Sequence, residues 1–85
     1  MKFIFASKFV RQYKKLPETI REQTKIILRA FQKDPFESQL KTHKLHGKLD
    51  GYWAFSVDYR IRILFEFATD NAVVFHSIGD HKIYD

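Results

Sequence analysis

The chain has 85 residues, of which 45% are hydrophobic and 16% aromatic, so it is long enough for one domain spanning residues 1–85 and too apolar to be disordered. It contains no cysteine and no apolar run approaching the roughly 20 residues of a membrane span, which excludes disulfides and predicts a cytoplasmic protein with no membrane partner. The formal charge of +5 predicts a polyanion or an acidic protein as a partner.

The N-terminal half has the pattern of one strand followed by two helices. Residues 2–6, KFIFA, form a short apolar run of strand composition, and Ser7 is placed to cap a following helix. Apolar residues then recur at helical spacing over residues 9–16, with basic residues between them. Pro17 is expected to end this helix and to begin a second one, which Pro35 ends. The result is a helical hairpin.

The C-terminal half has the alternation of strands with one buried face. Apolar residues alternate with more polar ones over 53–57 and again over 61–67, and a turn at 69–71, TDN, leads to a last strand at 72–78. The predicted order is therefore β-α-α-β-β-β. We expect an α+β fold in which a helical hairpin packs on one face of an antiparallel sheet.

The other face of the sheet is expected to be open and to carry Arg60, Arg62 and Glu66. Beyond the last strand, we expect Gly79 to turn the chain so that the polar ending HKIYD lies beside this face. A terminus usually frays, so a histidine, a lysine and a tyrosine held there by a strand indicate a functional role.

Three segments in this order, KLHGKLDGYWAFS, DYRIRILF and IGDHKIY, resemble the RelE/ParE superfamily of bacterial toxin–antitoxin toxins over nearly the whole chain. The resemblance implies the same order of elements and an active site on the open face of the sheet. It also implies endoribonuclease activity on mRNA, commonly on the ribosome, without a metal or other cofactor. A cognate antitoxin is the implied protein partner.

The resemblance assigns individual residues. Arg62 matches the family's arginine in the third strand, which is implied to contact the scissile phosphate. His81 stands where some members have arginine and the YafQ branch has histidine, and Tyr84 resembles the near-terminal aromatic residue that positions a base. His43 matches a position that is histidine in the YafQ branch and glutamate in the YoeB branch.

Other family roles do not carry over. Trp53 and Phe55 stand near the positions where other members have catalytic lysines, and Ser56 stands where the YafQ branch has a further histidine. The lysine roles therefore have no counterpart here.

The chemistry of metal-free RNA cleavage is consistent with these residue types. Such cleavage requires a base for the 2′-OH proton, a cation at the phosphate and an acid for the leaving oxygen. His43 is the candidate base, Arg62 the phosphate ligand and His81 the acid, and Tyr84 stacks on a base. The predicted RNA-binding residues are the neighbouring cations Lys41, Lys44, Lys48 and Arg60.

Each assignment has an alternative. His43 is also consistent with a surface loop residue, Arg62 with an ion pair to Glu66 or Asp58, and Tyr84 with a ring that ties down the terminus. Asp80 either orients His81 or only forms the turn. His46 and His76 are assigned no chemical role.

Two other functions share these features. A ParE-like toxin that binds DNA gyrase has the same fold and lacks the base, arginine and acid set. A plain single-strand RNA-binding domain would account for the basic charge and the aromatic residues.

Overall fold

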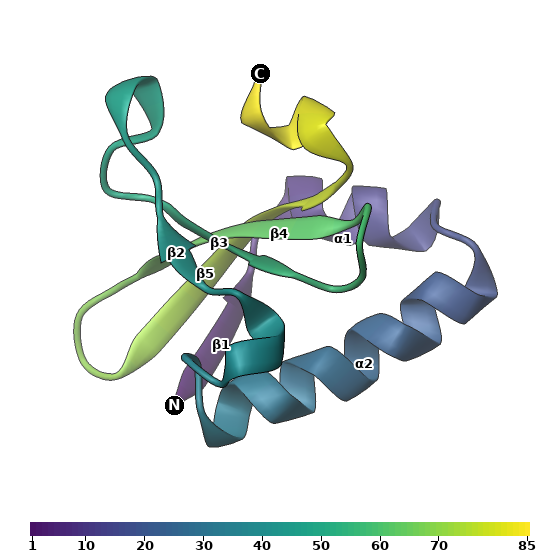
Figure 1. The fold of residues 1–85 in the computed structure, drawn as a ribbon, viewed down its shortest axis with the longest axis horizontal. Coiled ribbons are helices and arrows are strands. Elements are labelled where there is room, and N and C mark those ends of the chain that lie inside the picture. The colour runs from purple at the N-terminus through teal and green to yellow at the C-terminus, as the bar shows by residue number, and fades with distance from the viewer.

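The computed structural model describes all residues from 1 to 85 (Figure 1). Its helices and strands, in chain order, are β1 (Lys2–Phe5), α1 (Ser7–Lys14), α2 (Glu18–Lys33), β2 (His43–Lys44), β3 (Trp53–Ser56), β4 (Arg62–Phe67) and β5 (Ala72–Gly79). Short 3-10 turns cover Ser38–Leu40, Gly47–Leu49 and His81–Tyr84. The predicted α+β class and β-α-α-β-β-β order are confirmed, with the two-residue strand β2 as an addition.

The five strands form one sheet in the order β1-β5-β4-β3-β2. The strands from β2 to β5 pair antiparallel, whereas β1 pairs parallel with β5, so the expectation of a purely antiparallel sheet was wrong for this strand. Parallel neighbours need a long connection, and here both helices and three other strands separate β1 from β5 along the chain. The sheet is therefore mixed.

The prolines delimit the helices as expected. Pro17 occupies the N-cap position of α2, and α2 ends at Lys33, two residues before Pro35. The expected cap at Ser7 is not formed, because Ala6 is the N-cap residue of α1 and no side chain accepts a hydrogen bond from its first turn. Only Ala6 separates the end of β1 from the first residue of α1.

Both helices pack on the same face of the sheet, where aromatic rings fill the core. The ring of Phe31 on α2 is fully buried, and its centroid lies 4.7 Å from that of Phe55, 5.2 Å from that of Phe65 and 5.7 Å from that of Phe75. These three partners come from β3, β4 and β5. One helical side chain therefore contacts the three central strands at once.

A side chain of α1 completes the edge of β5. Strand β1 pairs with β5 only from Ala72 to Phe75, so the backbone further along β5 has a neighbouring strand on the β4 side alone. Gln12 fills this gap, because its Oε1 accepts a hydrogen bond of 2.9 Å from the backbone N–H of Ile78. A buried N–H group without a hydrogen-bond partner would destabilise the strand, and the Gln12 side chain supplies the partner for Ile78.

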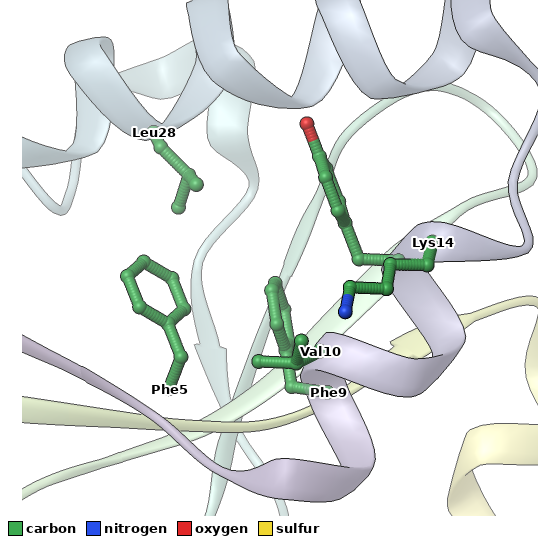
Figure 2. Close-up of a pocket in the computed structure, with 6 residues that line it drawn as sticks. Phe5, Phe9, Val10, Lys14 and Leu28 are labelled. Atoms are coloured by element: carbon green, nitrogen blue, oxygen red, sulfur yellow. The ribbon is translucent and has the colours of Figure 1, made fainter.

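An apolar hollow of about 370 Å³ opens between β1 and the two helices (Figure 2). Phe5, Phe9, Val10, Tyr13 and Leu28 line it, and Lys14 is the one charged side chain in the lining. Phe5 and Val10 are among the exposed large apolar residues of the protein. Neither helix is long and apolar enough to cross a membrane.

The aromatic core predicts a large loss of stability when Phe31 is truncated. We expect Phe31→Ala to lower the free energy of unfolding by about 3–5 kcal/mol, since the cavity left between three strands cannot collapse easily. Chemical denaturation measures this change, and Phe31→Leu, which retains most of the apolar volume, is expected to cost clearly less. Tyr59→Ala is the control because this side chain is 84% exposed. A loss below about 1 kcal/mol for Phe31→Ala would contradict the central role of this ring.

Candidate functional site

The open face of the sheet is defined by the alternation along β4. Ile63 and Phe65 belong to the hydrophobic core, so Arg62, Leu64 and Glu66 project from the opposite face, as expected. In the register of the sheet, Arg62 lies between Ser56 of β3 and Gly79 of β5. Small neighbours on both sides leave space around the Arg62 guanidinium.

Arg62 has hydrogen bonds but no acidic partner. Its Nη1 donates to the backbone oxygens of Asp58 and Ile61 in the β3–β4 turn, the second at 3.2 Å. The Asp58 carboxylate instead accepts from the backbone N–H groups of Arg60 and Ile61, and Glu66 pairs with His76. The alternative in which Arg62 forms an ion pair with Asp58 or Glu66 is therefore wrong, and its charge is available to an anion.

The chain end folds as a 3-10 turn on the opposite side of the sheet from α2, as Figure 1 shows in yellow. Strand β5 runs through Gly79, which has no left-handed backbone, so the expected turn at this glycine was wrong. The turn begins at Asp80, whose carboxylate accepts a 3.0 Å hydrogen bond from the backbone N–H of Lys82. Gly79 is needed for space, because a Cβ there would lie 3.0 Å from a methyl group of Ile83.

The C-terminal turn brings Tyr84 close to Arg62 and places His81 beside Tyr84. Ile83 is buried and anchors the turn, while the ring centroids of His81 and Tyr84 lie 6.2 Å apart. Burial raises the pKa of the Tyr84 phenol above its ordinary value, and the nearby positive charge of Arg62 partly opposes this rise. The phenol therefore stays protonated at neutral pH and is able to donate a hydrogen bond.

An open depression of about 470 Å³ adjoins this turn. Tyr59, Arg60, Asp80, His81 and Lys82 line it, so three of its five residues are cationic or histidine. Arg60 comes from the β3–β4 turn and His81 from the chain end. This arrangement presents hydrogen-bond donors to an anionic ligand.

His43 shares the open face but lies apart from the other candidates. It stands on β2, opposite Ala54 of β3, and its exposed ring Nδ1 lies 2.9 Å from the backbone oxygen of Lys41. Because β3 lies between β2 and β4, and His43 is level with Leu64 rather than with Arg62, the backbones of His43 and Arg62 are about 12 Å apart. The structure places Tyr84 near Arg62 and His81 beside Tyr84, and leaves His43 outside this cluster.

The predicted RNA-binding lysines are dispersed. The register pairs Lys44 with Trp53, and the Lys44 Nζ lies 5.9 Å from the centre of the indole ring, on the helix side of the sheet. Lys41 is an exposed residue in a left-handed conformation, and Lys48 lies exposed in the second 3-10 turn. Of the four cations proposed, only Arg60 lines the depression beside His81.

A second polar cluster on the open face was not anticipated. The His76 Nε2 and the Glu66 Oε1 lie 3.0 Å apart, and the Tyr52 ring meets the imidazole edge-on at 5.1 Å. The signal in the sequence was the pair of polar residues between the core residues Phe75 and Ile78, which breaks the strand alternation. No group of three or more His, Asp or Glu side chains lies close enough together to hold a metal ion.

The sequence matches no protein-family model and no curated protein, but the fold matches solved structures. The YoeB/ParE toxin from Agrobacterium tumefaciens superposes with a TM-score of 0.81 and 18% identity over 95% of this chain and 99% of that one. YafQ from E. coli strain BL21(DE3) superposes with a TM-score of 0.80 and 16% identity, over 98% of this chain and 96% of YafQ. The toxin–antitoxin complex RelBE2 from Mycobacterium tuberculosis gives a TM-score of 0.78 and 17% identity, over 94% of this chain and 96% of the matched chain. This chain therefore has the fold of the RelE, YoeB and YafQ toxins of toxin–antitoxin systems.

Proposed function

We propose that this protein is the toxin of a type II toxin–antitoxin system and acts as a metal-independent endoribonuclease on mRNA, in the cytoplasm and in association with the ribosome. The observation that carries the proposal is the Arg62 guanidinium, which has no carboxylate partner and adjoins a C-terminal turn bearing His81 and Tyr84. Similar folds in solved toxins support the same conclusion.

The proposed roles follow from the chemistry of each side chain. Arg62 binds the scissile phosphate, because a guanidinium donates two parallel hydrogen bonds to phosphate oxygens and keeps its charge. His81 protonates the departing 5′-oxygen, and Tyr84 contacts the adjacent base or ribose through its ring and its protonated hydroxyl. Attack by the 2′-OH on the phosphate leaves a 2′,3′-cyclic phosphate, and this reaction needs no metal.

His43 is the proposed base because it lies on the same face as Arg62. Its Nδ1 faces the Lys41 carbonyl, which makes Nδ1 the protonated nitrogen and leaves Nε2 as the proton acceptor. An RNA strand that reaches both residues has to cross β3, where Ser56 presents a small, partly exposed side chain. No observation in the site favours binding to gyrase.

The first prediction is cleavage of RNA in the absence of divalent metal. Purified protein incubated with RNA, with and without ribosomes, should cleave it in EDTA and leave a 2′,3′-cyclic or 3′ phosphate. End-group analysis of the fragments measures this outcome. Activity that disappears in EDTA would refute the proposed mechanism.

A second prediction concerns the two residues of the site with the most direct roles. His81→Ala and Arg62→Ala should each reduce the cleavage rate about 100- to 1,000-fold, corresponding to a loss of about 2.7–4 kcal/mol in the transition state. Because Arg62 also holds the β3–β4 turn, Arg62→Lys is included; it retains the charge but loses the paired hydrogen bonds.

His46→Ala is the matched control, since this histidine is exposed in a loop and has no proposed role. Thermal unfolding of each variant separates lost chemistry from lost structure. If folded His81→Ala and Arg62→Ala proteins cleave RNA like the parent, the roles proposed for these two residues are refuted. If the parent cleaves no RNA and both variants inhibit growth as it does, the ribonuclease function fails and a gyrase-binding function becomes the better explanation.

The antitoxin partner is proposed to be an acidic, amphipathic segment. Complexes such as RelBE2 have a toxin of this fold bound to its antitoxin. On this chain, the net charge of +5 and the exposed cations Lys41 and Lys48 favour an acidic partner. The hollow between Phe5, Val10 and Leu28, beside Lys14, offers a site for the apolar side chains of such a segment.

The charge complementarity predicts that antitoxin binding weakens with salt. Between about 0.05 and 0.5 M salt the screening length falls to about 4 Å, so contacts between exposed charges lose most of their strength. Titration calorimetry across this range should show a steadily rising Kd, and Lys41→Glu with Lys48→Glu should reduce the salt dependence. A Kd that does not change with salt would contradict a mainly electrostatic contact.

A further inference from the structure

An irregularity in the sheet places two polar side chains next to each other on the open face. The β4–β5 register pairs Leu64 with Ser77 and the next residue, Phe65, with Phe75, so His76 is an extra residue without a partner on β4. In a regular strand His76 and Ser77 would point to opposite faces. The bulge keeps both Phe75 and Ile78 in the core and turns His76 and Ser77 to the same side.

His76 is oriented by its contact with Glu66. A carboxylate only accepts, so the Nε2 of His76 carries the proton in this 3.0 Å hydrogen bond, and in the neutral ring Nδ1 is left as an acceptor. The side chains of His76 and Glu66 are 28% and 41% exposed, and the Tyr52 ring packs edge-on against the imidazole. The imidazole is therefore held in one orientation while one edge remains accessible.

A small depression of about 280 Å³ lies beside this pair. Tyr52, Leu64 and Ile83 supply aromatic and apolar walls, and His76, Ser77 and Asp85 supply polar groups. Lys8 of α1 is the cation at its border. The volume is just below the range of about 300–1,000 Å³ typical of ligand pockets, so the depression suits one flat ring with polar edges.

The depression is adjacent to the proposed phosphate site. Gly79 is opposite Arg62 in the register, and Ser77 is two residues before it, so the two positions are about 7 Å apart along β5. One nucleotide spans such a separation. An RNA strand with a phosphate at Arg62 therefore places a neighbouring base at the depression.

We propose that this depression binds one nucleobase of the RNA and that His76, oriented by Glu66, discriminates among bases. The Nδ1 of His76 and the carboxylate of Asp85 are acceptors, so they favour a base edge rich in donors. Guanine presents an imino N–H and an adjacent amino group, whereas uracil presents one N–H between two carbonyls. The subsite thus prefers guanine to uracil. This inference rests on the proposed function, in which RNA is the substrate.

The test is an NMR titration of the full chain with the four ribonucleoside 3′-monophosphates. Guanosine 3′-monophosphate should shift the ring signals of His76 and Tyr52 and the methyl signals of Ile83. Its Kd should be about tenfold lower than that of uridine 3′-monophosphate, as expected for one or two additional hydrogen bonds.

Two variants report on the role of His76. His76→Ala should raise the Kd for guanosine 3′-monophosphate about tenfold and leave the uridine nucleotide nearly unchanged, and Glu66→Gln should have a smaller effect in the same direction. His46→Ala is the control histidine. Amide spectra establish that each variant is folded.

Mapping of RNA cut sites separates this inference from the ribonuclease function. The His76→Ala protein should still cut RNA but lose the base preference at one position next to the cut. If the parent cuts RNA and His76→Ala alters neither nucleotide affinity nor base preference, the subsite is refuted and the ribonuclease function stands. If guanosine 3′-monophosphate binds at His76 and no RNA is cut, the subsite stands and the ribonuclease function fails.

Discussion

The contact between Phe31 and three strands determines which face of the sheet is available for function. Its ring packs against Phe55, Phe65 and Phe75, so α2 is held on the central strands and the helix-bearing face is filled. A chain of 85 residues can form one hydrophobic core, and the contacts of Phe31 place this core on the helix-bearing face of the sheet. The opposite face carries no α-helix, only the short 3-10 turn of the chain end, and Arg62, Glu66 and His76 remain partly exposed there.

The chain end gives this face its functional character. Ile83 is buried against the sheet, and the absence of a side chain at Gly79 makes room for it. The end of the chain is therefore held by an apolar anchor, and the polar residues on either side, His81 and Tyr84, have defined positions. The single buried side chain of Ile83 thus holds in place a chain end that would otherwise fray.

Two polar clusters on the open face differ in how their charges are compensated. Arg62 donates only to backbone oxygens, so it keeps a positive charge that attracts an anion. Glu66 lies four residues further along β4 and is paired with His76, so this second cluster presents oriented hydrogen-bonding groups and no free positive charge. The first arrangement suits a phosphate and the second suits an uncharged base, and both occur on the same face of one strand.

The amino-acid sequence by itself determined the order of the elements other than β2 and their approximate boundaries, because these depend on local signals. Pro17 and Pro35 mark the ends of helices, and the alternation from Trp53 to Phe67 identifies two strands and the side on which Arg62 lies. It also indicated that the polar chain end was held in place, although the reason given, a turn at Gly79, was wrong.

Only the tertiary structure decided which distant residues meet. The parallel pairing of β1 with β5 and the contact of Ile83 with Gly79 depend on packing between segments that no local pattern relates. The separation of His43 from Arg62 follows from the strand order, which places β3 between them. The His76–Glu66 pair depends on a bulge that shifts the register by one residue, and a one-residue shift changes the face to which a side chain points.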